Sequence, residues 1–428
     1  MPKHITALLI FCVSASAMAA GPLVLEGVSG HVPARYEDPN IVFDLETGPL
    51  NTQLDNDAAD QLVRDALDIW NVINTSSINL TASENIPTDI DATNFTSFIP
   101  DPYDSSVHND DDGLNPVVYD TDGSIIDAYF GIGQGTGANA SVVGFSASSI
   151  FIGASYFTEG FAVVNGNENL RISNNQLTLI IAHEIGHYMG LDHTQVNISN
   201  TESLFDACPA AANEYPLMYP YACRTSEITH PDDNISLSIL YPISNLNQSL
   251  GQLTGTFKTA DGTPVNGANI WVQNTSTGDI YSIVSDYLKQ CRGFFALLLP
   301  PGNYTVHANS INDEFYAGSS VGPWAANEID SSFQPPASTL GLVDFNAGGT
   351  PPAIINLAAG KAADIDFRAD GSGSITLSDS QIDLAQIYNA AGSCSPTDTT
   401  SDGGGGSPSL PLLTAVLCLS LLRRMRQD

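Results

Sequence analysis

Basic residues are scarce in this sequence. Its 428 residues include 13 lysines and arginines against 47 aspartates and glutamates, which gives a formal net charge of −34. Phosphate recognition depends on clustered lysine and arginine side chains, and no such cluster lies outside the extreme C-terminus. The composition therefore argues against nucleic acid as a partner. Because 43% of the residues are hydrophobic, we expect a globular protein kept soluble by its charge, and the length suggests two domains.

Long hydrophobic runs are also missing, since a spanning helix needs about 20 apolar residues. Residues 1–19 combine a positive start at Lys3, a short apolar run and the small-residue pattern Ala17-Met18-Ala19. This combination is typical of a secretory signal peptide that is removed near Ala19. A membrane anchor is the weaker alternative, because the run is short. We therefore expect the mature protein to be exported.

Cysteines are few, and none lies between Cys12 in the signal peptide and Cys208. Cys418 belongs to the C-terminal apolar tail. Four cysteines remain, and they allow three pairings in an oxidising compartment: Cys208, Cys223, Cys291 and Cys394. We favour a bond between Cys208 and Cys223, which would close a short loop. The second pair would then be Cys291 and Cys394, and free buried thiols are the alternative.

The first half of the mature chain mixes helical and extended patterns. Apolar residues recur every three or four positions in 56–71, which predicts an amphipathic helix. A second helix is expected from about Asn175 to Met189, capped by Asn174 or Asn175. A third starts at THPD, residues 229–232, which resembles a capping box. Four strands are predicted at 40–45, 77–81, 125–130 and 141–145. Helices around a mixed sheet predict an α+β domain at residues 20–245.

Residues 250–370 have short alternating runs separated by Gly, Asn and Pro turns, which predicts an antiparallel β-sandwich. The stretches GQLTGTF, DGTPVNGANIWV and LPPGNYTV resemble the carboxypeptidase regulatory-like, transthyretin-like module. The resemblance implies an all-β unit with a spacer, stabilising or surface-binding role and without catalytic residues. We expect residues 371–408 to be a linker that is rich in glycine at its end.

Residues 409–428 form a short apolar stretch followed by Arg423, Arg424 and Arg426. With the preceding glycines, this tail resembles the bacterial glycine-glycine C-terminal sorting signal. The resemblance implies a transient membrane tether and processing by a rhomboid-type intramembrane protease. It also implies a secreted or cell-surface protein of a Gram-negative-type bacterium, with the arginines on the cytoplasmic side. An ordinary tail anchor is the alternative.

Three histidines cluster around one glutamate in the stretch IIAHEIGHYMGLDHT. His183 and His187 lie four residues apart, so a helix places both imidazoles on one face, where they can share a metal ion. Gly190 ends the helix and permits the reversal that returns His193 as a third ligand. Three neutral nitrogens suit zinc and leave a fourth position for water, whose proton Glu184 can accept. The pattern predicts a catalytic zinc site for amide hydrolysis.

The pattern HExxHxxGxxH resembles that of the metzincin metallopeptidases. This family implies an α+β catalytic domain with a mixed sheet and a zinc helix, and a turn that carries a methionine beneath the metal. Met218, in the stretch PLMYP, has the position of that methionine, and its neighbours are similar to the matrixin branch. Pro220 stands where astacins carry a tyrosine ligand, so we expect no such ligand. A propeptide cysteine switch is not expected either, since the required region has no cysteine.

Other stretches have weaker site patterns. Asp120 and Asp122 resemble part of a calcium loop, and matrixin-like domains often bind structural Ca²⁺; solvated acidic turns are the alternative. Residues 131–137 are glycine-rich, but a phosphate loop should lead into a helix, and a strand pattern follows instead. Four isolated histidines are expected at the surface or in the core: His31, His108, His230 and His307.

The leading hypothesis is a secreted zinc-dependent endopeptidase that acts on protein or peptide substrates. A zinc-bound water activated by Glu184 would hydrolyse the peptide bond, with the three histidines as metal ligands. The alternative is a catalytically silent cell-surface binding protein or adhesin that uses the β-sandwich. The intact Glu184 favours the enzyme. The sequence indicates no oligomeric state and no preferred substrate.

Overall fold

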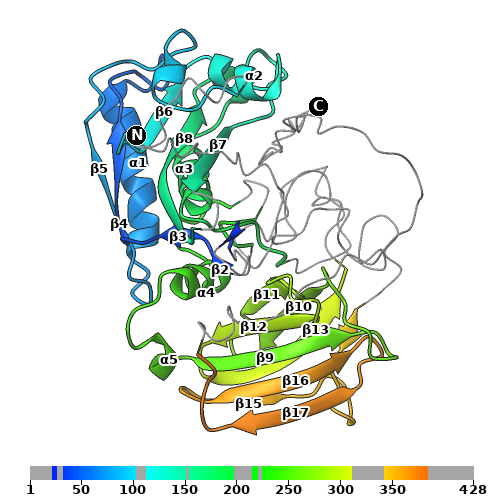
Figure 1. The fold of residues 1–428 in the computed structure, drawn as a ribbon. Helices are drawn as coiled ribbons and strands as arrows, with labels where there is room; N and C mark the ends of the chain where they lie inside the picture. Colours follow the sequence, from blue (N-terminus) through cyan, green and yellow to red (C-terminus); the bar gives the residue numbers. More distant parts are fainter. Residues whose placement is uncertain are drawn as a thin grey trace, which may run out of the picture.

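The computed structural model describes residues 22–26, 32–102, 112–150, 154–196, 215–219, 224–310 and 342–383. Within them the chain forms a mixed α/β unit followed by a β-sandwich (Figure 1). The predicted signal peptide and C-terminal tail lie outside the described residues. No helix in the described part of the chain is long and apolar enough to cross a membrane.

A six-stranded sheet forms the centre of the α/β unit, in the order β3-β8-β6-β4-β5, with β7 paired to β8. Strands along that path are parallel, whereas β7 is antiparallel to β8. The strands are β3 (Arg35–Tyr36), β4 (Asn40–Leu45), β5 (Asn79–Ser83), β6 (Pro116–Asp120), β7 (Gly144–Ile150) and β8 (Tyr156–Asn165). A short hairpin of β1 (Leu25–Glu26) and β2 (Val32–Pro33) precedes the sheet.

Two long helices, α1 (Asn56–Asn71) and α3 (Asn174–Tyr188), pack against each other beside this sheet. The indole Nε1 of Trp70 in α1 donates a hydrogen bond to the carbonyl of Ala182 in α3 at 2.8 Å. Every side chain of α3 from Leu177 to Tyr188 is buried. A helix that is largely apolar on all sides is enclosed by the core, and α3 is such a helix.

Most of the predicted helices and strands of this unit are present, although some bounds are shifted and one element is of the other type. The helix at 56–71 and the strand at 40–45 have the predicted bounds. The strands expected at 77–81 and 141–145 are shifted towards the C-terminus, to β5 and β7. The strand predicted at 125–130 is wrong, because those residues belong to the helix α2 (Ser124–Phe130). The carboxylate of Asp120 accepts hydrogen bonds from two amides in the first turn of α2 and so favours the helix.

Side-chain caps set the N-terminal ends of α3 and α4. Ser173 caps α3 and forms a capping box with Gln176, so the predicted cap at Asn174 or Asn175 is wrong. The third predicted helix is confirmed as α4 (Pro231–Leu240), which begins after His230. The shorter helical segments are η1 (Phe95–Ser97), η2 (Glu168–Leu170) and α5 (Leu246–Ser249).

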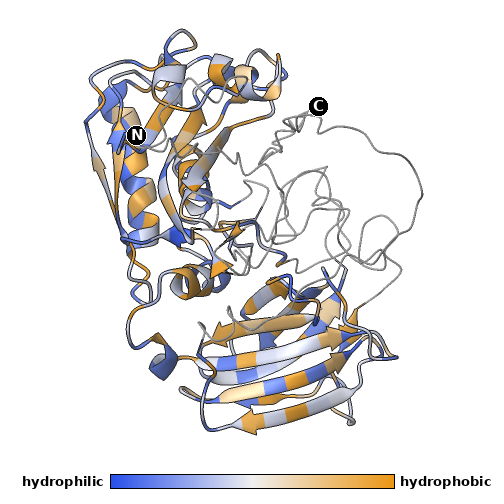
Figure 2. Ribbon diagram, viewed as in Figure 1, coloured by the Kyte–Doolittle hydropathy of each residue, from blue (hydrophilic) through white to orange (hydrophobic). Residues whose placement is uncertain are grey.

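Two sheets form the β-sandwich, in the orders β12-β9-β16-β17 and β11-β10-β13-β14, with β15 paired to β13. The strands are β9 (Gly251–Lys258), β10 (Asn269–Asn274), β11 (Ile280–Val284), β12 (Phe294–Leu299), β13 (Gly302–Asn309), β14 (Val343–Asp344), β15 (Ile355–Leu357), β16 (Ala362–Arg368) and β17 (Gly373–Ser378). Hydrophobic and polar residues alternate along β16 and β17 (Figure 2). Side chains such as Phe367 therefore point into the core between the sheets.

The β-sandwich departs from its prediction in two respects. β9 and β16 pair in parallel, whereas an antiparallel arrangement was predicted throughout. The sheet also continues beyond Asp370, because β17 pairs with β16 along its whole length. Residues 373–378 thus belong to the sandwich and not to the predicted linker.

The cap at the start of α4 depends on pH. His230 is buried, and its Nδ1 accepts the backbone N–H of Asp232 at 3.1 Å. Burial, together with the charge of Arg224, lowers the pKa of this imidazole from 6.5 to about 3. The unfolded chain therefore binds a proton more tightly than the folded chain, and stability is lost as the pH falls from 6.5 towards 3.

We predict that His230→Asn, which keeps a capping oxygen but does not titrate, removes this loss. Between about pH 7 and pH 4.5 the free energy of unfolding of the native protein should fall by about 2 to 3 kcal/mol more than that of the variant, since each unit of pH below the unfolded pKa contributes about 1.4 kcal/mol. Urea unfolding at the two pH values measures the difference. Equal losses in both proteins would contradict a neutral, buried cap.

Candidate metal centre

His183 and His187 project from α3, one helical turn apart. Gly190 follows the helix with a φ of +97°, and a Cβ at this position would lie 2.9 Å from the carbonyl oxygen of Ala34. Glycine alone meets both conditions without strain. The chain can therefore reverse here, and it brings His193 back to the helix.

The three imidazoles meet at their Nε2 atoms. Nε2 of His193 lies 3.2 Å from Nε2 of His183 and 3.0 Å from Nε2 of His187. All three side chains are buried, and their ligand nitrogens lie within 4.8 Å of one another. Within the described ranges this is the group of histidine, cysteine and acidic side chains with the geometry to hold a metal ion.

Two backbone carbonyls fix the orientation of the helical imidazoles. Nδ1 of His183 donates to the carbonyl of Leu217 at 2.7 Å, and Nδ1 of His187 donates to that of Leu191 at 2.8 Å. A neutral ring that carries its proton on Nδ1 presents a lone pair at Nε2, the form that binds a metal. These hydrogen bonds therefore direct both lone pairs to the common point.

Burial also keeps the rings neutral. It lowers the pKa of His183 to about 4 and that of His187 to about 3, and the pKa of His193 lies well below its ordinary value. Neutral imidazole is the form that ligates metals, and three nitrogens with one open position are typical of catalytic zinc. Lone pairs that converge in a buried space repel one another unless a cation or a proton lies between them. The donor set therefore fits a zinc ion.

Glu184 follows His183 directly in α3 and is also buried. Burial raises the pKa of its carboxyl group to about 8, and its Oε2 has no hydrogen-bond partner among the described residues. Strand β7 passes close to this side chain, because a Cβ at Gly144 would lie 3.2 Å from Cγ of Glu184. A buried carboxyl group with a perturbed pKa and an unused oxygen is suited to proton transfer.

Met218 lies on a turn that packs against α3. The turn is closed by a hydrogen bond from the amide of Tyr219 to the carbonyl of Pro216 at 3.2 Å. Met218 is fully buried, and a Cβ at Gly186 of α3 would lie 2.3 Å from its sulfur. Its carbonyl accepts the amide of Thr194 at 3.0 Å. The turn thus contacts both α3 and the segment that follows His193, whereas Pro220 lies outside the described residues.

Asp233 supports this turn, and the sequence did not predict that role. Its buried carboxylate accepts hydrogen bonds from the amides of Leu217 at 2.7 Å, Met218 at 3.1 Å and His230 at 3.0 Å. The predicted capping box, residues 229–232, ends at Asp232, whereas the structure places the box one residue later, with His230 as the cap and Asp233 as its partner. A local pattern cannot show that the same carboxylate also holds a turn far away in the sequence.

Asp120 and Asp122 belong to no metal-binding group among the described residues. Both carboxylates accept amides near the start of α2, with Asp122 bound to the amide of Ser124 at 2.9 Å. Helix capping accounts for this acidic turn, and a calcium site here stays a prediction.

The remaining predicted residues are spread over both units. Cys291 is disulfide-bonded. The other three cysteines of the predicted pairs lie outside the described residues, so both pairings stay predictions: Cys208, Cys223 and Cys394. Nδ1 of His307 contacts the carboxylate of Asp344 at 2.7 Å in the β-sandwich. His31 and His108 lie outside the described residues.

No family model and no curated protein matches the chain. A candidate cell adhesion protein from Bacteroides ovatus is similar over 32% of this chain and 46% of its own, with 12% identity and a TM-score of 0.19. The 5-hydroxyisourate hydrolase of Klebsiella pneumoniae is similar over 30% of this chain and 90% of its own, with 17% identity and a TM-score of 0.16. This chain thus spans less than half of the Bacteroides protein, and similarity at these scores carries no argument about function.

We predict that Asp233→Ala destabilises the protein by about 2 to 4 kcal/mol, because it leaves buried amides of the Met218 turn without an acceptor. The Leu217 carbonyl that orients His183 should loosen as well, so zinc affinity should fall by roughly 10- to 100-fold. Asp233→Asn is the matched control, since it keeps one acceptor oxygen and should lose less. Urea unfolding and competition with a zinc chelator measure the two effects. An Ala variant as stable as the Asn variant would contradict this role of Asp233.

Proposed function

We propose that this protein is a zinc-dependent endopeptidase of the matrixin-like metzincin type that acts on protein or peptide substrates. The observation that carries the proposal is the convergence of three buried Nε2 atoms beside a helix position occupied by a buried glutamate. The HExxHxxGxxH pattern supports the same assignment, and so does the packing of Met218 against Gly186.

His183, His187 and His193 would hold the zinc ion. When bound, zinc supplies a Lewis acid that polarises the substrate carbonyl and lowers the pKa of a water molecule to about 7. The hydrogen bonds from Nδ1 to the carbonyls of Leu217 and Leu191 keep the rings in the ligating orientation.

Glu184 would act as general base and then as general acid. Its carboxylate takes a proton from the attacking water and passes it to the amine that leaves. A nearby divalent cation favours the ionised carboxylate and so opposes the burial that raises its pKa to about 8. Oε2 is available for the proton, since it has no partner among the described residues.

The ends of the sequence support an extracellular setting for this activity. The signal-peptide pattern at residues 1–19 and the sorting-signal pattern at residues 409–428 favour a secreted or cell-surface enzyme with a transient membrane tether. A separate protease would process that tail. The net charge of −34 disfavours binding of nucleic acid, which is also negatively charged. Proteins and peptides should therefore be tested first as substrates.

We predict that the purified protein holds about one zinc ion and hydrolyses an unfolded protein such as casein, and that Glu184→Gln keeps the zinc but lowers kcat by roughly 100- to 10,000-fold. The substitution preserves size and removes only the acid–base group. Metal analysis and an assay with fluorescent casein measure the two quantities.

His193→Ala is the matched control for metal binding, since it should lose both zinc and activity. A Glu184→Gln variant as active as the native protein would show that another group transfers the proton. A native protein that binds zinc but cleaves no protein or peptide offered would favour the alternative of a silent binding protein.

A further inference from the structure

The segment after His193 lies between the α/β unit and the β-sandwich. Thr194 and Gln195 follow the third metal ligand directly, and both are fully buried. Unlike His183 and His187, His193 is not carried by a helix. Its position therefore depends on the contacts that the neighbouring residues make.

Asp232 connects this segment to the edge of the sandwich. Its Oδ2 accepts the hydroxyl of Thr194 at 2.8 Å, and its Oδ1 accepts the amide of Ser282 in β11 at 3.0 Å. The carboxylate is buried, and each of its oxygens has a partner from a different unit. A buried carboxylate with two such hydrogen bonds holds both partners firmly, because breaking either one leaves a buried polar group unpaired.

Asn269 makes a second connection on the neighbouring strand β10. Its Nδ2 donates to the carbonyl of Gln195 at 3.2 Å and to Oδ1 of Asn309 at 2.9 Å. The side chain is buried, so water does not compete freely for these bonds. Both residues that follow His193 are thus bonded, directly or through Asp232, to strands of the sandwich.

Apolar packing holds the two units together around these hydrogen bonds. Ile235 of α4 and Leu246 of α5 belong to the hydrophobic core of the sandwich. Helix α4 contacts β11 and β12, and Figure 1 shows it between the α/β unit and the sandwich. The contact therefore resembles a shared core more than a joint between two mobile domains.

We propose that the β-sandwich is a positioning element of the metal centre, which fixes His193 through the Thr194–Asp232–Ser282 and Gln195–Asn269 connections. This inference rests on the proposed zinc site and assigns the sandwich a role beyond that of a spacer. Asp232 and Asn269 act through the segment that carries the ligand, so they are positioning residues and not catalytic ones. Loss of either connection should lower the affinity of the protein for zinc while the protein still folds.

The test uses zinc affinity and the visible spectrum of the cobalt-substituted full-length protein. Thr194→Val removes the hydroxyl that Asp232 accepts, and Asn269→Ala removes the donor to Gln195. Each should weaken zinc binding by roughly 10- to 100-fold and alter the cobalt spectrum, which reports ligand geometry. Thr194→Ser restores the hydroxyl and should restore both properties. If Thr194→Val does not fold, Asn269→Ala still tests the inference, because the side chain of Asn269 belongs to the sandwich and not to the segment that carries His193.

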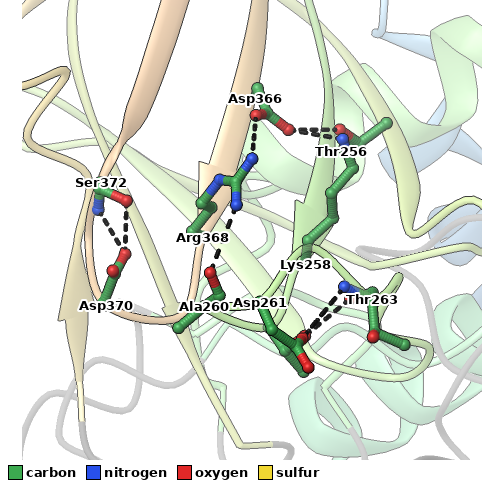
Figure 3. A network of polar contacts seen from close by, with 10 residues as sticks. Thr256, Lys258, Ala260, Asp261, Thr263, Asp366, Arg368, Asp370 and Ser372 are labelled. Carbon is green, nitrogen blue, oxygen red and sulfur yellow. Dashed lines mark hydrogen bonds and ion pairs between the residues drawn. The ribbon is translucent and has the colours of Figure 1, made fainter.

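A matched control lies elsewhere in the same sandwich. Nζ of Lys258 contacts the carboxylate of Asp366 at 2.6 Å, and Arg368 contacts the same carboxylate (Figure 3). Lys258→Met removes this ion pair without touching α4 or the segment after His193, so zinc affinity should stay unchanged.

The outcomes separate this inference from the proposed function. Native zinc affinity and an unchanged cobalt spectrum in both Thr194→Val and Asn269→Ala would overturn the positioning role, while the zinc site itself would stand. An equal loss of affinity in Lys258→Met would also overturn it, since the effect would then reflect general destabilisation. A folded native protein that binds no zinc would overturn the proposed function and this inference together.

Discussion

The hydrogen bond from Nδ1 of His183 to the carbonyl of Leu217 is the constraint on which the orientation of His183 depends. This hydrogen bond can hold the imidazole of His183 in place only because the carbonyl of Leu217 is itself held in place. Asp233 holds the amides of that turn, and Asp233 stands in the first turn of α4. Helix α4 in turn packs against the β-sandwich. The orientation of His183 thus depends on contacts that extend across both units.

Buried carboxylates have two different uses in this protein. A carboxylate removed from water is costly unless hydrogen bonds replace its hydration. Asp232 and Asp233 accept amides and a hydroxyl with both oxygens, and so they hold chain segments in place. Glu184 leaves Oε2 without a partner among the described residues. This unpartnered oxygen distinguishes Glu184 from the two aspartates of α4, and in the proposed mechanism it receives the proton.

The sequence predicts features whose causes are local. The helix at 56–71 has strong periodicity, the strand at 40–45 is a short apolar run, and the bounds of both were predicted correctly. The three histidines were predicted because their spacing and the glycine at position 190 form a recognisable local pattern. The segment 125–130 was assigned to a strand because its neighbours are β-like. It forms a helix instead, and the carboxylate of Asp120 stabilises the first turn by accepting two of its amides. The roles of Asp232 and Asn269 could not be predicted, since each joins segments that are distant in the sequence.

The most direct test of the central claim is X-ray absorption spectroscopy at the zinc edge of the purified full-length protein. We expect one zinc ion with three imidazole nitrogens at about 2.0 to 2.1 Å and a further light ligand. A native spectrum without imidazole scattering, or with sulfur ligands, would contradict a centre built from His183, His187 and His193.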